Sequence, residues 1–176
     1  MTAPREVFGT IHRRNRWGSR ESVSGTGSTL AATRSLRSRL PGVLQRLGVR
    51  TLADAPCGDG RWIRPVSAGL DFYLGVDIVD ALILANSRAN ERPDHLYIVL
   101  DLAGQVLPPF DAILCRDLLG HLEPVLARRV LENVRLSRSR YLIATTFPHK
   151  ANRVVRTGGW YPINLEAAPF SLPPPL

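Results

Sequence analysis

The sequence predicts an α/β fold, in which a mostly parallel sheet carries helices on both faces. Short apolar runs alternate with segments of helical periodicity between residues 51 and 146, a pattern typical of repeated strand–helix units. Acidic residues close three successive apolar runs, at the ends of strands where parallel sheets collect ligands. The length of 176 residues, of which 44% are hydrophobic and 22% charged, fits one globular domain with its own core.

The segment before the first predicted strand divides into two parts. Residues 1–28 are rich in Gly, Ser and Arg and lack sustained periodicity, so we predict a basic lid or flap. Apolar residues at helical spacing then predict a helix over residues 30–47. We expect Pro41 to divide this helix, because proline removes a main-chain donor and clashes with the preceding turn, and Gly48 to end it.

Strands and helices then alternate. Further helices are predicted from Arg61 or Trp62, over residues 79–90 and over residues 122–136. The five predicted strands are residues 51–54, 72–77, 96–100, 111–115 and 141–146. Right-handed crossovers between them make a Rossmann-like three-layer sandwich.

We predict a single domain over residues 1–176, with its core at residues 29–150. Residues 151–176 form a Pro-rich cover segment that ends in Pro173-Pro174-Pro175-Leu176 and has no strand pattern.

Composition excludes several other classes of protein. No apolar run is long enough for a membrane span, and the Arg-rich start does not resemble a secretory signal, so we expect a cytoplasmic protein. Cys57 and Cys115 lie at the ends of neighbouring predicted strands, outside any metal-binding pattern, and we expect reduced thiols.

Basic charge is concentrated at the start of the sequence. Residues 1–50 contain ten arginines and two glutamates, which accounts for the whole net charge of +8. Such a segment could attract RNA, an anionic membrane or a phosphorylated substrate, and an ordinary solvated surface explains it equally well.

Three acids and a glycine turn indicate an adenosine-containing ligand. Asp54 closes the first strand, and the turn with Gly58 and Gly60 lets the main chain approach a ligand closely. Asp77, at the end of the second strand, could accept hydrogen bonds from both ribose hydroxyls, and Asp101 ends the third strand beside an adenine site.

These motifs resemble those of the class I S-adenosylmethionine-dependent methyltransferases. Their first motif is an acid followed by three alternating glycines, and Pro56, Gly58 and Gly60 occupy those places here. A small bacterial subgroup resembles the chain from about Trp17 to its end, through the segments WGSRESVSGTGST, DAPCGDGRW, CRDLLGH, TTFP and NLEAAPFSLPPPL. The resemblance implies a methyltransferase that converts S-adenosyl-L-methionine to S-adenosyl-L-homocysteine. Members of this family usually have two further strands after the fifth, so the resemblance also implies that either the sheet lacks its final strands or the chain is truncated. The candidate cofactor-binding residues are Ser24, Gly25, Arg34, Asp54, Pro56, Cys57, Gly58, Gly60, Asp77, Ile78, Asp101, Leu102 and Arg116.

A nicotinamide dinucleotide is the competing ligand. Its pyrophosphate needs the full Gly-x-Gly-x-x-Gly turn at a helix amino terminus, which this sequence lacks. Asp59 is expected to bring a negative charge toward that pyrophosphate, so the methyltransferase is favoured.

Asp117 and His121 are the candidate catalytic residues. They are four residues apart after the fourth strand, and on a helical turn they would share one face. His121 suits a general base near neutral pH, and Asp117 could orient it or act itself. The alternatives are that the pair caps and packs the following helix, or binds a divalent metal with Asp59 or Asp101, for which too few ligands are identified.

The acceptor is less constrained than the methyl donor. Candidate substrate residues, which suit a polyhydroxylated ring, are Trp17, Glu21, Trp160 and Asn164. Our first hypothesis is methylation of a hydroxyl on a small polar acceptor such as a saccharide. The alternatives are methylation of RNA, guided by the basic amino terminus, and a cofactor-binding protein without turnover.

Overall fold

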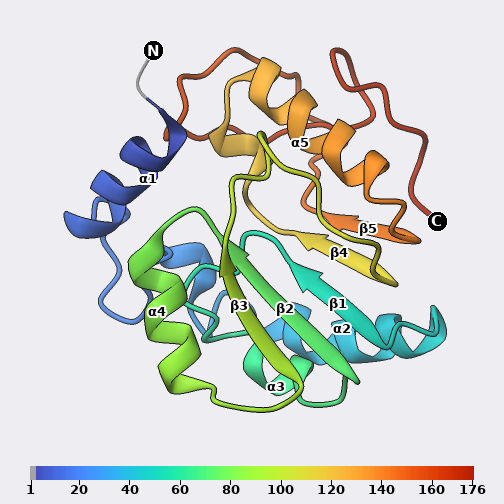
Figure 1. The fold of residues 1–176 in the computed structure, drawn as a ribbon. Helices are drawn as coiled ribbons and strands as arrows, with labels where there is room; N and C mark the ends of the chain where they lie inside the picture. Colours follow the sequence, from blue (N-terminus) through green and yellow to red (C-terminus); the bar gives the residue numbers. More distant parts are fainter. Residues whose placement is uncertain (1–2) are drawn as a thin grey trace.

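A computed structural model describes residues 3–176, so the first two residues of the predicted flap lie outside the described range. Five strands form one sheet in the order β3-β2-β1-β4-β5, and every neighbouring pair is parallel (Figure 1). The strands are β1 (Thr51–Asp54), β2 (Phe72–Asp77), β3 (His95–Val99), β4 (Ala112–Cys115) and β5 (Tyr141–Ala144). The predicted α/β fold with a parallel sheet is confirmed.

The direction of strand addition reverses beside β1. The chain adds β2 and β3 on one side of β1 and then crosses to β4 and β5 on the other side. Parallel sheets bind ligands beyond the carboxyl ends of the strands at such a switch point. The topology therefore places the candidate site next to the loops that follow β1 and β4.

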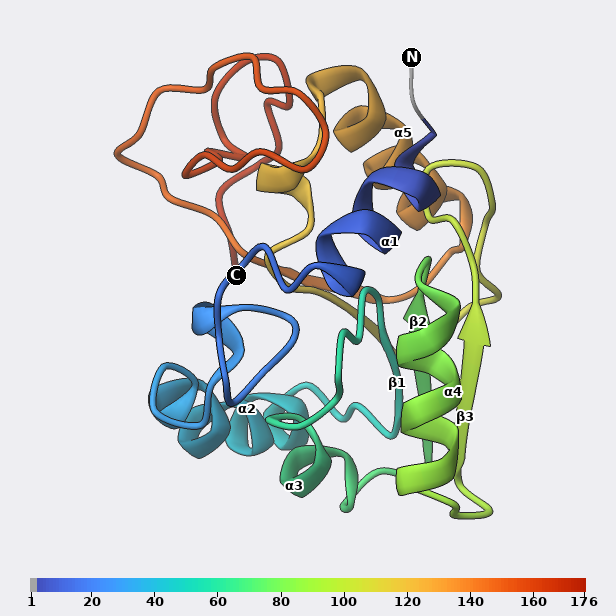
Figure 2. The same ribbon diagram turned by 90° about the vertical axis from the view of Figure 1, so that its left-hand side faces the viewer.

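Five α-helices and two 3₁₀ turns accompany the sheet in the described part of the chain. The α-helices are α1 (Pro4–Arg13), α2 (Arg34–Arg46), α3 (Arg64–Ser67), α4 (Asp80–Ala89) and α5 (Pro124–Leu136). The 3₁₀ turns are η1 (Thr26–Ser28) and η2 (Leu119–His121). Figures 1 and 2 both show α4 alongside β2 and β3.

Helix α1 was missed in the segment predicted as an irregular flap. Pro4 stands in its first turn, where the missing N–H costs nothing, and Glu6 complements the helix dipole there. Phe8 and Ile11, three residues apart, are buried in the core. Two buried anchors in ten residues were too short a pattern to stand out among the surrounding arginines.

The expected division of α2 at Pro41 is wrong. The helix runs through Pro41, which lies on its exposed side. Leu40 and Leu44 are each only 3% exposed, so the helix is packed against the core on both sides of the proline. Packing of an apolar face, rather than local propensity, supplies most of a helix's stability, and here it outweighs the lost hydrogen bond.

Two apolar clusters cover the opposite faces of the sheet. Alternate strand residues divide between them: Ala53 and Leu74 pack with α1 and α5, whereas Leu52 and Tyr73 pack with α2 and α3. The cysteines divide likewise, with Cys115 in the first cluster and Cys57 in the second, and both are free thiols.

Residues 145–176 form no helix or strand, yet they are not a loose tail. Tyr161, Ile163 and Leu165 are buried in the cluster that also holds α1 and α5. Figure 2 shows this tail, in orange and red, at the same end of the molecule as α1. No helix within residues 3–176 has the length and apolar character needed to cross a bilayer.

Candidate functional site

A cavity of about 720 Å³ opens at the carboxyl ends of the strands. Segments that follow β1, β2 and β4 line it, together with α1, the segment before α2 and the tail that follows β5. The predicted site residues on its wall are Trp17, Ser24, Gly25, Pro56, Cys57, Gly58, Asp77, Ile78, Arg116, Asp117, His121 and Trp160. The topological switch point therefore coincides with a chamber large enough for a small-molecule ligand.

The turn after β1 is tied to the end of β2. The Gly58 N–H donates to Asp77 Oδ2 at 3.1 Å, and the Gly58 carbonyl accepts from the Asn86 side chain at 2.7 Å. Gly58 has φ +55° and Gly60 φ +63°, a conformation that favours glycine. A Cβ on Gly58 would also collide with the Ser24 hydroxyl.

Asp77 combines deep burial with open acceptor capacity. Its other oxygen, Oδ1, accepts the Val79 N–H at 2.9 Å, so each carboxylate oxygen holds one main-chain donor and retains a lone pair. Burial raises the pKa of Asp77 to about 6, and the main-chain N–H donors act against this increase. The carboxyl group is thus held at the cavity wall at a cost in desolvation.

Asp54 lies behind the cavity wall rather than on it. Its carboxyl group is buried at the end of β1 and accepts a hydrogen bond from Tyr73 OH at 2.8 Å. Burial raises the pKa of Asp54 to about 7. Two buried acids therefore stand at adjacent strand ends, and only Asp77 lines the chamber.

The segment before α2 is fastened over the β1 turn by polar contacts. Ser22 Oγ donates to Asp59 Oδ2 at 2.7 Å, and the Asp59 N–H donates to Ser24 Oγ at 2.8 Å. The Asp59 carboxylate thus engages this segment and does not line the chamber. We expected the charge of Asp59 to oppose a pyrophosphate. Because this carboxylate is hydrogen-bonded to Ser22 outside the chamber, it does not discriminate between S-adenosylmethionine and a dinucleotide.

Arg116 joins β4 to the same segment. Its guanidinium donates to the Gly27 carbonyl at 2.8 Å, pairs with Asp117 Oδ2 at 3.0 Å and lies over the Trp62 ring, 5.3 Å from its centroid. Asp117 has φ +54° and its N–H donates to Thr145 Oγ1 at 3.1 Å. Asp117 is therefore oriented by Arg116 and by Thr145, the first residue after β5, and within residues 3–176 no hydrogen bond joins it to His121.

His121 has one ring nitrogen engaged and the other free. Nδ1 lies 2.6 Å from the Gly159 carbonyl oxygen, and Nε2 has no hydrogen-bond partner within residues 3–176. The Trp17 ring lies 5.0 Å from the imidazole, centroid to centroid. Burial lowers the pKa of His121, which keeps the ring neutral near pH 7.

The remaining predicted site residues lie away from the main cavity. Asp101 and Leu102 line a smaller apolar cavity that shares Asp77 and Ile78 with it. Gly60 packs against Asn86, and Arg34 lies exposed on α2. Two substrate candidates serve loop structure: the Glu21 side chain accepts the Leu30 N–H, and the Asn164 side chain donates to the carbonyls of Pro148 and Lys150.

Several cavity residues were not predicted from the sequence. Phe8 and His12 come from α1, Trp62 from the loop after β1, and Phe147 from the tail. The one local signal for them was the helix start at Pro4, because the other two segments have no periodicity. Their convergence depends on tertiary packing.

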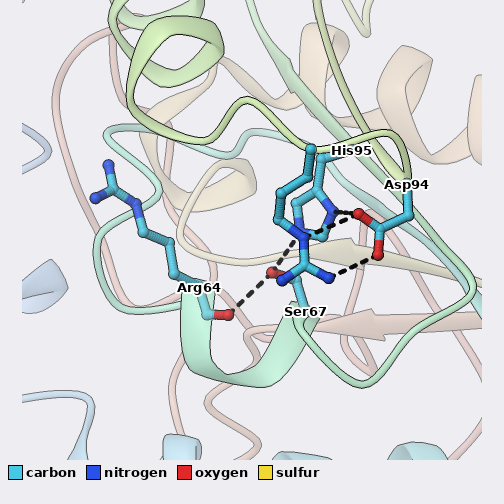
Figure 3. Close-up of polar contacts among 5 residues, drawn as sticks. Arg64, Ser67, Asp94 and His95 are labelled. Carbon is cyan, nitrogen blue, oxygen red and sulfur yellow. Dashed lines mark hydrogen bonds and ion pairs between the residues drawn. The ribbon is translucent and has the colours of Figure 1, made fainter.

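A second polar cluster lies at the amino end of β3 (Figure 3). His95 Nε2 lies 3.0 Å from Ser67 Oγ and Nδ1 lies 2.9 Å from Asp94 Oδ1, which is a Ser-His-Asp arrangement. Ser67 is 1% exposed and lines no part of the main cavity, and its hydroxyl also contacts the Arg64 carbonyl. With its hydroxyl shut away from solvent, this arrangement fastens α3 to β3 and offers no accessible nucleophile.

No three His, Cys, Asp or Glu side chains gather as a metal site anywhere in residues 3–176.

No protein-family model and no curated protein matches the sequence. Solved structures do match its fold.

Magnesium protoporphyrin IX methyltransferase from Synechocystis PCC 6803, with bound SAM, has a TM-score of 0.63 and 16% identity. The match covers 87% of this chain and 80% of that one. The chain has the fold of an S-adenosylmethionine-dependent methyltransferase.

Two further structures share this fold. CalS10, a SAM-bound amino pentose methyltransferase from Micromonospora echinaspora, matches with a TM-score of 0.57 at 14% identity, over 81% of this chain and 58% of that one. The methyltransferase domain of bacterial CtHen1 matches with a TM-score of 0.59 at 15% identity, over 68% of this chain and 71% of that one.

Proposed function

We propose that this chain is an S-adenosylmethionine-dependent methyltransferase that methylates a hydroxyl group of a small polar acceptor. The observation that carries the proposal is a single cavity, at the switch point of a methyltransferase fold, with Asp77 and the Gly58 turn on its wall together with His121. One chamber therefore offers a nucleoside-binding end and a free basic nitrogen.

The residues present fit the methyl donor. Asp77 would hold the ribose hydroxyls with its remaining lone pairs, and Ile78 with Leu118 would contact the adenine. Gly58 and Gly25, which both have positive φ, lie on the cavity wall, where their main chain would contact the methionine part. When bound, S-adenosylmethionine supplies an electrophilic methyl group on a sulfonium.

His121 would act as the general base. Its neutral ring keeps a lone pair on Nε2, which can take the proton of the acceptor hydroxyl while the oxygen bonds to the methyl carbon. This transfer would break the carbon–sulfur bond of the donor, whose electron pair would stay on sulfur. Asp117 is occupied by Arg116, so we assign it to holding that side chain.

Aromatic side chains define the acceptor end of the chamber. Trp17, Phe147 and Trp160 line it, and Trp160 meets Phe147 edge-on at 6.2 Å. Flat rings beside polar groups suit the faces of a saccharide. The same fold serves an amino pentose in CalS10.

Calorimetry with S-adenosylmethionine, followed by a screen of hydroxylated acceptors with isotope-labelled methyl donor, tests the proposal. We expect micromolar donor binding in the wild type, strong weakening in Asp77→Ala and label transfer to at least one saccharide. Donor binding without transfer to any acceptor would favour a binding protein without turnover. Absence of donor binding would refute the proposal.

RNA is the second candidate acceptor, and the exposed arginines of α2 favour it. Arg34, Arg39 and Arg46 lie on the exposed side of that helix, and α2 contains no acidic residue. Phosphate contacts by such a surface would make RNA binding weaken steeply as salt rises. RNA binding that is absent at low salt would remove this candidate.

A further inference from the structure

The tail segment Thr157–Tyr161 is hydrogen-bonded to the turn that carries His121. The Gly158 N–H donates to the His121 carbonyl at 2.8 Å, and the Tyr161 N–H donates to the Gly120 carbonyl at 3.1 Å. Between them, the Gly159 carbonyl oxygen lies 2.6 Å from His121 Nδ1. The segment therefore grips both the backbone and the ring of His121.

Gly120 makes this close approach feasible. A Cβ at Gly120 would lie 2.5 Å from the carbonyl oxygen of Tyr161, closer than real contacts allow. The obstructing atom belongs to the main chain, so a side-chain rotation could not relieve the clash. Any residue other than glycine would push the tail segment away from the turn.

The Gly159 carbonyl determines which nitrogen of His121 carries the proton. A carbonyl oxygen only accepts, so Nδ1 must be the donor in this contact. In the neutral ring, Nε2 is then unprotonated and available as an acceptor. A neutral histidine without such a partner distributes its proton between both nitrogens, and only one of the two forms would serve as a base from Nε2.

We propose that the Thr157–Tyr161 segment is a positioning element that holds His121 in its Nδ1-protonated form, and that Gly120 is the positioning residue that admits it. Trp160, within the same segment, lines the acceptor end of the cavity. Acceptor contact and base orientation therefore depend on one stretch of five residues. This inference rests on the proposed role of His121 as general base.

Nitrogen-15 NMR of the wild-type protein tests the inference without any acceptor. The chain has four histidines, and comparison with His121→Asn assigns the signals of His121. At neutral pH we expect the chemical shift of a protonated nitrogen at Nδ1 and that of an unprotonated nitrogen at Nε2. Protonation at Nε2, or an even mixture of the two forms, would overturn the proposal.

The variant Gly120→Ala separates positioning from stability. Its control is Gly69→Ala, because a Cβ at Gly69 meets no atom within 4 Å. We expect Gly120→Ala to give mixed tautomers at His121 and, with an active acceptor, a turnover about 100-fold lower. S-adenosylmethionine affinity should stay within about twofold of wild type, and Gly69→Ala should change nothing.

Unchanged His121 signals in folded Gly120→Ala would overturn the proposal. If this variant fails to fold, the wild-type spectrum still decides whether the tautomer is fixed. A fixed tautomer in a protein that binds no S-adenosylmethionine would refute the proposed function while leaving the positioning contact intact. The two failures are therefore distinguishable.

Discussion

Two histidines at opposite ends of the sheet differ in how completely their hydrogen bonds are satisfied. His95, at the amino end of β3, has a partner at each nitrogen, and its side chain is 4% exposed. His121, beyond the carboxyl end of β4, has a partner at Nδ1 alone and lines the cavity. A satisfied ring stabilises the fold, whereas a ring with a free nitrogen at a cavity can move a proton.

The acids at the two ends show the same contrast. Burial raises the pKa of Asp54 to about 7 and of Asp77 to about 6 at the carboxyl end. At the amino end, hydrogen bonds from Arg92 lower the pKa of Asp94, and the main-chain N–H groups of Arg50 and Thr51 lower that of Asp111. The ionised acids at the amino end therefore stabilise the fold. Ionisation of the buried acids at the carboxyl end costs desolvation free energy, which is typical of functional sites.

The largest expected effect comes from substitution of His121, the histidine whose Nε2 has no hydrogen-bond partner. His121→Asn should lower kcat between about 100-fold and 10,000-fold, the range for loss of a general base, with S-adenosylmethionine affinity nearly unchanged. Steady-state kinetics and calorimetry measure the two quantities separately. Undiminished kcat would exclude His121 as the base.

At the amino end of the sheet we expect substitution of His95 to lower stability and not turnover. His95→Leu should lower the free energy of unfolding by about 2 kcal/mol, because the Ser67 hydroxyl loses a buried partner and the Tyr73 ring, 5.0 Å away, loses a packing contact. Urea denaturation measures this, with Ser67→Ala as the milder comparison. A loss of turnover without a loss of stability would show that the amino end also serves function.

The alternating pattern of strands and helices could be predicted from the sequence. Contacts between segments far apart in the chain could not. Strand periodicity located all five strands to within about two residues, and the acids at strand ends pointed to Asp77. The sequence alone could not show that Asp54 is hydrogen-bonded to Tyr73, that Asp59 is hydrogen-bonded to Ser22, or that Gly159 is hydrogen-bonded to His121. Those contacts join segments far apart in the chain and leave no local pattern.

A smaller effect is expected at Asp77. Asp77→Asn should weaken S-adenosylmethionine binding about tenfold, or 1.4 kcal/mol, because an amide accepts at one atom only. In the wild type, ribose hydroxyls favour the ionised carboxylate, so affinity should fall as the pH drops below about 6. Calorimetry at pH 6 in buffers of different ionisation enthalpy should detect proton release on binding. If no proton is released, Asp77 does not bind the ribose.

The smallest expected effect is a change in stability at Asp54, and its sign is opposite to that at Asp111. The pKa of Asp54 rises from 3.8 in the unfolded chain to about 7, so the native state binds the extra proton and unfolding becomes easier as pH rises across that window. The shift sets an upper limit of about 4 kcal/mol on the penalty above pH 7. Because a buried amide still needs hydrogen-bond partners, Asp54→Asn should gain about 1 kcal/mol at pH 8.

Asp111→Asn is the matched control for that measurement. The folded pKa of Asp111 is lowered by main-chain donors, so its ionised form stabilises the protein above the unfolded pKa and this stability is lost as pH falls through the folded value. At pH 8, Asp111→Asn should therefore destabilise the protein where Asp54→Asn stabilises it. Thermal melts of both variants between pH 4 and pH 8 decide the matter, because equal losses in the two would mean that the ends of the sheet do not differ in how they hold charge.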